Sequence, residues 1–301
     1  MKQKNRLKDA RGKHDCRNQM LEKIFFGVFL IAIVLTTIYT IKRNIDNQNS
    51  KQLQRDLVNQ KENIVKSFKM PMAGVASVLE EIDWLSDEPD IGARKQKMLP
   101  EYNTLYKENP DIIGWLRIDD TVIDYPVMQT IGDEGYYLDY GFDGKRNSNG
   151  SLILDTDSIA GVGTNETNYK NGILPTTNLI IHGHTMKSGQ MFGNLKLYKN
   201  EEYGREHPII SFDSLYEKRE YELIAVFYSQ VYMNTDEVFK YYKFFNADTQ
   251  EEFDDWYENI KQMSLYDTGI KAKFGDEFIT LSCCSYQVED GRFVVIGKRI
   301  K

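Results

Sequence analysis

An uncharged, apolar run of 18 residues near the N-terminus is the feature that most limits how this chain can fold. It reads IFFGVFLIAIVLTTIYTI from Ile24 to Ile41, with Lys23 before it and Lys42-Arg43 after it. As a helix the run would rise about 27 Å, close to the roughly 30 Å hydrocarbon core of a bilayer. A buried core helix would show a polar stripe, and a cleaved signal peptide would have a shorter apolar region ending in small residues. The run has neither feature, so the sequence predicts a retained, membrane-spanning signal anchor.

Charge is divided unevenly about this run. Residues 1–23 carry eight Lys or Arg against three Asp or Glu, so the remainder carries −12 within a chain of net charge −7. The basic tail predicts a cytoplasmic N-terminus, with everything after residue 43 outside the cell membrane. The acidic remainder argues against nucleic acid as a partner. We therefore expect a cytoplasmic tail over 1–23, a transmembrane segment over 24–41, a stalk or linker over 42–79 and an extracellular domain over 80–301.

The texture of the chain changes at Asn109-Pro110. Before it, residues 44–70 are polar and read as a helical or flexible stalk, and helices are expected over 72–85 and 93–108. Tyr102, Leu105 and Tyr106 are spaced i, i+3, i+4, which predicts that the second helix packs on the domain that follows.

After this point, short β-branched and aromatic runs are separated by turn residues. A helix is expected over 249–265, and strands are expected over 112–118, 121–128, 151–154, 178–182, 208–212, 220–232, 241–245, 277–286 and 292–300. About eight short strands without regularly alternating helices favour a mainly β, closed or nearly closed barrel over a parallel α/β sheet.

The strand expected over 277–286 contains two adjacent cysteines. Successive strand residues point to opposite faces, so Cys283 and Cys284 cannot both meet one cleft. Cys283 falls on an apolar face, which is typical of a core, and Cys284 on a polar face, which is typical of a cleft. The apolar face holds Ile279 and Leu281, and the polar face holds Thr280 and Ser282. This makes Cys284 the candidate nucleophile; the alternative is that both are small buried hydrophobic residues, the commonest fate of a free cysteine.

A thiol is a nucleophile only as its thiolate, so it needs a nearby base or cation. His184 and Arg292 are the candidates. His182 and His184 are two residues apart and could share one face of a strand, which raises the alternative of a metal site with a cysteine as third ligand. No further ligand follows at recognisable spacing, and three cysteines without a CxxC pair indicate neither a metal centre nor a disulfide framework. Arg292 is either a solvated charge or a fixed fork that holds an oxyanion, and spacing alone leaves this open.

Several motifs together resemble the class B sortases. Thr280-Leu-Ser-Cys-Cys284 resembles the TLxTC signature of sortases, with Cys283 where the family usually has Thr. Ile181-His-Gly-His184-Thr-Met resembles the segment that holds the sortase histidine. The class B resemblance rests on further segments in the same order, and on the long helix before the cysteine strand. These segments are Asn109–Ile118 (NPDIIGWLRI), Ile123–Val127 (IDYPV), Tyr136–Leu138 (YYL) and Gly150–Asp155 (GSLILD). The resemblance covers about residues 80–301.

The resemblance implies a closed eight-stranded barrel with N-terminal helices, and cysteine transpeptidation without a cofactor or metal. Cys284 would attack the Thr carbonyl of a sorting motif resembling NPxTN or NPxTG. His184 would serve as general acid and base, and Arg292 would stabilise the oxyanion or hold the substrate Thr. The residues implied to contact the substrate are Ser282, Tyr286 and Leu138.

The implied partners are secreted proteins with a C-terminal sorting signal and an amine on a lipid-linked peptidoglycan precursor, both outside the membrane. Three other functions stay open. The first is a pilin polymerase, whose acceptor is a lysine of another protein. The second is a cysteine peptidase that uses water as acceptor. The third is a non-catalytic, membrane-anchored binding module in which Cys284 and His184 are core residues.

Overall fold

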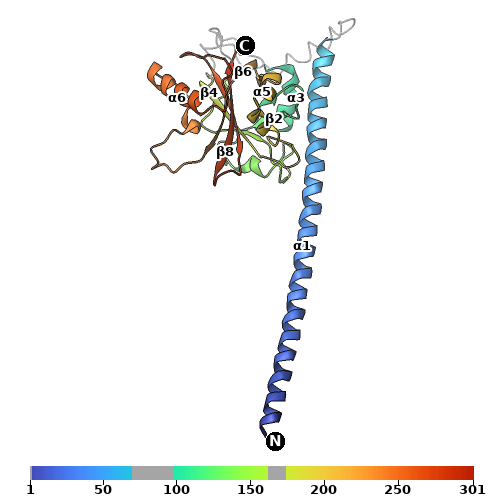
Figure 1. Ribbon diagram of the computed structural model, residues 1–301. Coiled ribbons are helices and arrows are strands. Elements are labelled where there is room, and N and C mark those ends of the chain that lie inside the picture. Colours follow the sequence, from blue (N-terminus) through green and yellow to red (C-terminus); the bar gives the residue numbers. More distant parts are fainter. Residues whose placement is uncertain (1, 70–97, 162–173) are drawn as a thin grey trace. The chain divides into compact units, whose positions relative to one another are not determined.

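The computed structural model describes residues 2–69, 98–161 and 174–301 of the chain (Figure 1). Two compact units are distinguished, Met1–Asn49 and Ser50–Lys301. The helix expected over 72–85, and the first part of that expected over 93–108, fall outside the described residues.

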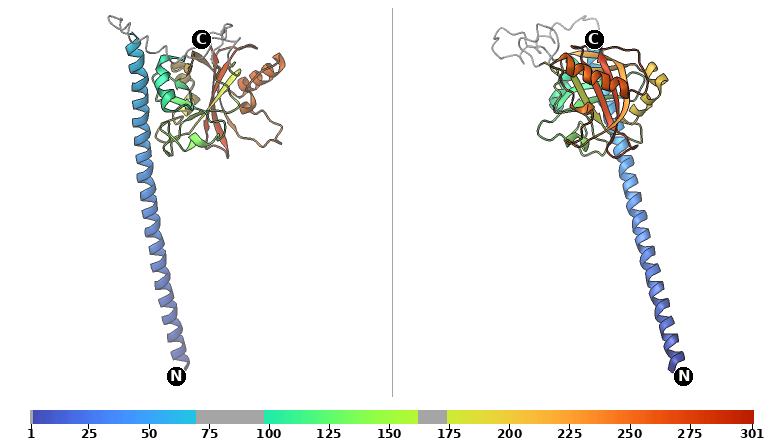
Figure 2. Two further views of the ribbon diagram at one scale, coloured as in Figure 1. Left: turned by 180° about the vertical axis from the view of Figure 1, so that it is seen from behind. Right: turned by 60° about the vertical axis from the view of Figure 1, so that its left-hand side comes forward.

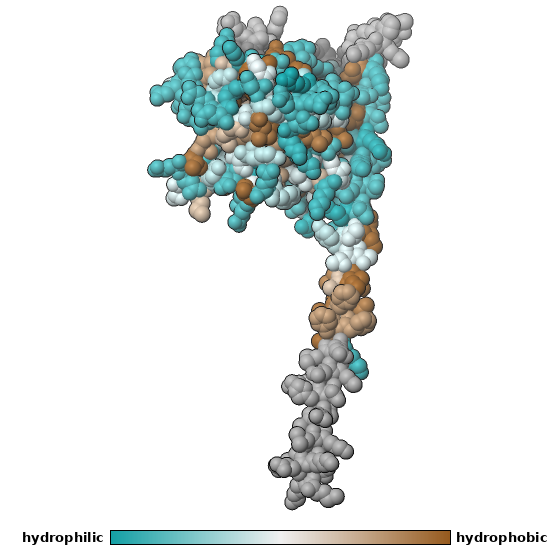
Figure 3. Space-filling view, viewed as in Figure 1, coloured by the Kyte–Doolittle hydropathy of each residue, from teal (hydrophilic) through white to brown (hydrophobic). Residues whose placement is uncertain are grey.

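The first unit lies within the long helix α1 (Lys2–Lys69). The uncharged run forms part of this helix, and its large side chains are exposed, with Phe25 at 76% and Leu35 at 61%. Figure 3 shows these side chains as a brown stretch of the helix. Among the described helices, this one has the length and apolar composition needed to cross a membrane. The helix is thus compatible with the expected membrane anchor.

The second unit is built on eight strands that close into a barrel in the order β1-β2-β3-β4-β7-β8-β6-β5, as far as the chain is described. This confirms the predicted closed, mainly β fold. The strands are β1 (Ile112–Arg117), β2 (Asp124–Met128), β3 (Leu152–Leu154), β4 (Asn178–Gly183), β5 (Ile209–Ser214), β6 (Lys218–Gln230), β7 (Phe278–Cys284) and β8 (Gly291–Arg299). Most neighbours are antiparallel, including the sequential pair β1–β2, but β2–β3 and β4–β7 are parallel.

Helices and short 3₁₀ turns surround the barrel. They are α3 (Pro100–Glu108), α5 (Glu201–Glu206), α6 (Gln250–Met263), η2 (Tyr136–Leu138), η3 (Leu195–Lys199) and η4 (Tyr241–Lys243). The strands that carry the site residues are therefore supported from outside as well as by the barrel interior.

The barrel wall is packed on both faces because successive side chains along each strand point alternately inward and outward. Inward side chains of β7, including Ile279 and Leu281, join the central core. Its outward side chains face a second cluster beneath α6, which lies across the front of the barrel in the right-hand view of Figure 2. Trp256 of α6 packs edge-on against Phe278 with ring centroids 4.7 Å apart. A capping box between Thr249 and Glu252 begins α6 and satisfies its first amide groups.

The prediction of a strand over 241–245 is wrong, because Tyr241–Lys243 forms the 3₁₀ turn η4. Its aromatic residues have high strand propensity, but here they pack between β7 and α6. Tyr241 and Phe244 are buried in the second cluster, and the Phe244 ring stacks on Trp256 at 4.2 Å. Tertiary contacts have overridden the local preference.

The last part of α1 belongs to the barrel unit. Leu57 is 5% exposed and joins a third cluster with Tyr102 and Leu105 of α3 and with Trp115 of β1. The expected packing of Tyr102 and Leu105 is confirmed, whereas Tyr106 is 40% exposed. The compact unit therefore begins at Ser50, inside the segment expected to be a stalk over 42–79, because apolar side chains of α1 pack on the barrel.

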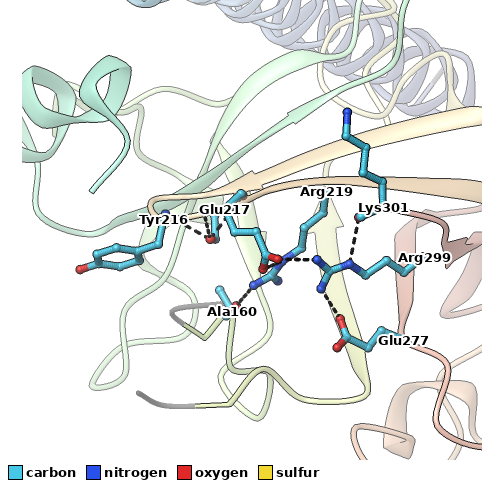
Figure 4. Close-up of polar contacts among 8 residues, drawn as sticks. Ala160, Tyr216, Glu217, Arg219, Glu277, Arg299 and Lys301 are labelled. Carbon is cyan, nitrogen blue, oxygen red and sulfur yellow. Dashed lines mark hydrogen bonds and ion pairs between the residues drawn. The ribbon is translucent and has the colours of Figure 1, made fainter. Parts of the chain in front are cut away.

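An ion-pair network joins strand ends at the opposite end of β7 and β8 from Cys284 (Figure 4). Glu217 accepts hydrogen bonds from Arg219 at 3.0 Å and from Arg299 at 2.6 Å, and Arg299 also bonds Glu277 at 2.7 Å. Burial alone would raise the pKa of Glu217, but the two guanidinium groups outweigh it and lower that pKa. This network ties the start of β6 to the end of β8.

Candidate active site

Three adjacent strands bring the candidate catalytic residues to one end of the barrel. In the β4–β7 pair Gly183 lies opposite Cys283, so His184 follows directly beside Cys284. In the β7–β8 pair Cys284 lies opposite Arg292. The Thr185 hydroxyl donates a 2.6 Å hydrogen bond to the Cys284 carbonyl, which fixes the chain after His184 against the end of β7. Residues that are far apart in sequence thus meet around Cys284.

The two cysteines are in different environments, as the alternation along the strand predicts. Cys283 is 2% exposed within the central core, whereas Cys284 is half-buried. Burial raises the pKa of the Cys283 thiol to about 11, although the nearby Thr185 hydroxyl acts in the opposite direction. At neutral pH the Cys283 thiol therefore stays protonated and unreactive, which leaves Cys284 as the more accessible thiol of the pair.

The polar side chains on the outward face of β7 do not line an open cleft, contrary to the expectation. Ser282 and Thr280 are each 1% exposed beneath the outer layer. The Ser282 hydroxyl shares a 2.7 Å hydrogen bond with Tyr241, and the Thr280 hydroxyl donates to Asn178 at 2.9 Å. Both hydroxyl groups are satisfied by hydrogen bonds inside the protein, so polar residues at these two positions do not require contact with solvent.

His184 is oriented by the backbone of a distant loop. Its Nε2 atom lies 2.8 Å from the carbonyl oxygen of Leu138 at the end of η2. A carbonyl can only accept, so Nε2 carries the hydrogen and donates it. The ring nitrogen left to gain or lose a proton is therefore Nδ1. This contact was not expected from the sequence, where Leu138 was a candidate substrate contact.

The position of the Leu138 carbonyl depends on a glycine. Gly150 has a φ of +59°, and a Cβ atom at this position would lie 2.4 Å from the Leu138 oxygen. Both the backbone conformation and the space beside it therefore call for glycine. The Gly150-Ser-Leu motif supplies this close approach next to the histidine's partner.

Arg292 folds back onto the turn that precedes it. Its Nη1 atom donates to the carbonyl groups of Asp290 at 3.1 Å and Gly291 at 3.0 Å. Asp290 has a φ of +51°, and the Ser285 amide donates to the Gly291 carbonyl at 2.8 Å, which closes the β7–β8 turn. Arg292 is thus the strand partner of Cys284 in the β7–β8 pair, and its guanidinium is bound to the carbonyl groups of the adjoining turn.

The first histidine of the Ile181–His184 segment has a separate partner. His182 Nε2 lies 3.0 Å from the Asp155 carboxylate. Burial alone would raise the pKa of Asp155, but the hydrogen bonds from His182 and from the Asp157 amide lower it overall. Within the part of the chain that is described, no group of three or more His, Cys, Asp or Glu is arranged to hold a metal ion.

The three expected substrate contacts differ in accessibility. Tyr286 is 83% exposed in the turn after β7, and Leu138 is 40% exposed beside His184. Ser282 is buried and hydrogen-bonded, so its hydroxyl is not available at the surface. The sequence analysis did not identify Thr185 or Gly150 as part of the site. Their positions could have indicated them, because Thr185 directly follows His184 and Gly150 begins one of the segments that resemble class B sortases.

Comparison with known proteins identifies the class. No family model matches the chain. Sortase B of Listeria monocytogenes is 35% identical over 202 residues, covering 66% of this chain and 74% of that protein. Sortase B of Staphylococcus aureus is 26% identical over 216 residues, covering 70% and 79%. The crystal structure of sortase B from Bacillus anthracis in complex with AAEK1 superposes with a TM-score of 0.61 at 26% identity, over 85% of this chain and 99% of that one.

The chain belongs to the sortase B family. It is accordingly an enzyme, a cysteine transpeptidase of the sortase type built on the closed barrel described above. The resemblance drawn from the motifs is thereby confirmed.

Proposed function

We propose that the enzyme cleaves a sorting motif of the NPxT[NG] type after its Thr, through a thioacyl intermediate on Cys284, and transfers the protein to an amine of a peptidoglycan precursor. The observation that carries this proposal is the strand register, which sets Cys284 between His184 and Arg292. Sorting-signal proteins as donors and peptidoglycan-linked amines as acceptors follow from membership of the family.

In the first half-reaction the Cys284 thiolate attacks the Thr carbonyl carbon, and the peptide C–N bond breaks. His184 gives the proton on Nδ1 to the leaving amine, and a thioester remains. The Arg292 guanidinium donates hydrogen bonds to the carbonyl oxygen as it becomes negative, or holds the Thr. In the second half-reaction an acceptor amine attacks the thioester carbon, His184 takes the amine's proton, the C–S bond breaks, and Cys284 leaves as the thiolate, which restores the starting thiolate–imidazolium pair. No step needs a cofactor.

We propose that the enzyme works outside the cell membrane, with residues 1–23 in the cytoplasm, 24–41 in the bilayer and the catalytic domain on the outer side. The apolar exposed surface of α1 and the basic residues before it support this orientation. The proposed substrates, a translocated protein and a lipid-linked precursor, are both reached from that side.

The test uses the full-length chain in detergent micelles with an NPxTG-type peptide and a diamino acceptor. Cys284→Ala should abolish cleavage, whereas Cys283→Ala should retain it and lose about 1 kcal/mol of stability. Mass spectrometry should detect the acyl-enzyme and, with acceptor present, a transfer product. Wild-type cleavage by Cys284→Ala would disprove the assigned nucleophile.

The same experiment separates the other functions. A product formed only with water indicates a peptidase. If a lysine-bearing protein is added as a second acceptor, a product formed only with that lysine indicates a pilin polymerase. Failure to cleave the peptide, with the barrel folded, would mean that the sorting motif is not of the NPxT[NG] type. A product with the diamino acceptor supports the proposed wall anchoring.

A further inference from the structure

A serine of α1 lies at the centre of a buried polar network near His184. The Ser50 hydroxyl oxygen accepts hydrogen bonds from the side-chain amides of Asn147 at 2.7 Å and Asn149 at 3.0 Å. Asn149 is fully buried and Asn147 is 9% exposed. Ser50 belongs to the same compact unit as the barrel. The network therefore connects the helix to the turn over residues 147–150.

This turn sets the position of the carbonyl group that orients His184. The Asn147 amide donates to the Asp139 carbonyl at 2.7 Å, and the Ser151 amide donates to the Tyr137 carbonyl at 2.8 Å. These bonds bracket Leu138, whose oxygen accepts the hydrogen bond from His184 Nε2. A shift of the turn would therefore move the acceptor of the imidazole.

The network also reaches the main chain on the other side of His184. The Asn149 side-chain amide lies 3.4 Å from Gln190 Oε1, and Gln190 is 4% exposed. Gln190 lies in the loop that returns to His184, where the Phe192 amide donates to the His184 carbonyl at 3.1 Å. Both the ring and the backbone of His184 are thus linked to Asn149, and through it to Ser50.

The network has little capacity to adapt. Among the described residues, Asn149 Oδ1 and Gln190 Nε2 are buried without a hydrogen-bond partner. Removal of the Ser50 hydroxyl would take away the acceptor of the Asn147 side-chain amide and leave the Asn149 amide with the longer bond to Gln190 Oε1. Because an unsatisfied buried group is costly, the turn is expected to move until its amides find new partners.

We infer that Ser50 is a positioning residue for His184, so that α1 takes part in arranging the active site as well as in anchoring the chain. The inference rests on the proposed catalytic role of His184. It predicts that a substitution at Ser50 of α1 changes the orientation of the His184 imidazole ring.

The test compares Ser50→Ala, Ser50→Thr and Ser67→Ala in the full-length chain. Ser67 is an exposed serine of the same helix, and its hydroxyl donates a local hydrogen bond to the Ile64 carbonyl, one turn earlier, at 2.7 Å. In Ser50→Ala, kcat for peptide cleavage should fall about three- to tenfold, the effect of one hydrogen bond, with KM nearly unchanged. Ser50→Thr keeps the hydroxyl and should restore most of the activity, and Ser67→Ala should match wild type.

A second readout does not depend on activity. The chain has four histidines, so ¹⁵N-histidine labelling resolves their ring signals, with His184→Gln to assign the relevant one. Ser50→Ala should shift the His184 signal in the absence of substrate. An unshifted signal, or an equal loss of kcat in Ser67→Ala, would overturn the inference. Full activity of His184→Ala would instead overturn the proposed role of His184, and the shift would still test the positioning.

Discussion

Gly150 shows how closely the histidine's partner is packed. A methyl group at this position would collide with the Leu138 oxygen, and the φ of +59° adds backbone strain. Gly150→Ala should therefore lose about 1–2 kcal/mol of stability from strain and about ten- to hundredfold in kcat from displacement of the carbonyl. Thermal unfolding and peptide-cleavage kinetics measure the two effects.

Gly144 provides the matched control. It also has a positive φ, +68°, but in the described part of the chain no atom beyond its sequence neighbours lies within 4 Å of the position its Cβ would take. Gly144→Ala should show the loss of stability without the loss of kcat. Equal kcat values for the two variants would mean that the Leu138 carbonyl does not orient His184 for the proposed reaction.

At this scale, alternation along β7 was sufficient to separate Cys283 from Cys284, since strand faces follow directly from sequence order. The acceptor of His184 could not be predicted in the same way. It is a backbone oxygen 46 positions earlier in the chain, and a carbonyl group leaves no signature in the residue type.

The second layer on β7 is the feature that matters at the scale of elements. The Tyr241 hydroxyl meets Ser282 behind the cysteine strand, and burial raises the pKa of Tyr241, so it stays a neutral hydrogen-bonding phenol. Ser282→Ala and Tyr241→Phe should each destabilise the fold, and a double-mutant cycle should give a coupling free energy of about 1 kcal/mol. Denaturant unfolding of the two single variants and the double variant measures it.

The same Ser282→Ala variant should keep the KM of the wild type, because the hydroxyl faces the second layer. A KM raised severalfold, with stability unchanged, would restore Ser282 as a substrate contact. The second layer also explains why a strand was wrongly expected over 241–245. Tyr241 is buried by α6, which follows later in the chain, and the strand propensity of a short segment carries no information about such a contact.

For the whole molecule, the network around Glu217 predicts how stability responds to acid. The folded-state pKa of Glu217 is below its ordinary value of 4.5, so its contribution is present above that pH and is lost as the pH falls through the folded-state value. Between about pH 6 and about pH 3, the melting temperature should therefore fall more for the wild type than for Glu217→Gln.

Glu258→Gln, at an exposed residue of α6, is the control and should keep the acid sensitivity of the wild type. If Glu217→Gln loses stability with acid as steeply as the wild type, the ion pairs with Arg219 and Arg299 do not account for this part of the response.

The barrel as a whole could be predicted because short strands without alternating helices have few other ways to bury their apolar faces. The parallel β2–β3 and β4–β7 pairs could not, since strand order depends on contacts between distant segments. The start of the compact unit at Ser50 could not be read from the sequence for a related reason. The apolar positions of α1 are too sparse to indicate packing until the surface formed by Tyr102 and Trp115 is known.

The β4–β7 pairing has a consequence for folding. Thr185 and Cys284 are 99 positions apart, and two other strands lie between theirs in the chain. Closing so long a loop costs entropy before its contacts can compensate, so such pairings form slowly. A newly made chain therefore has a thiol with no imidazole beside it until the barrel has closed. Regain of transpeptidase activity should accordingly lag behind the regain of helical signal during refolding. During this period the proposed nucleophile, Cys284, is present without its proposed partner.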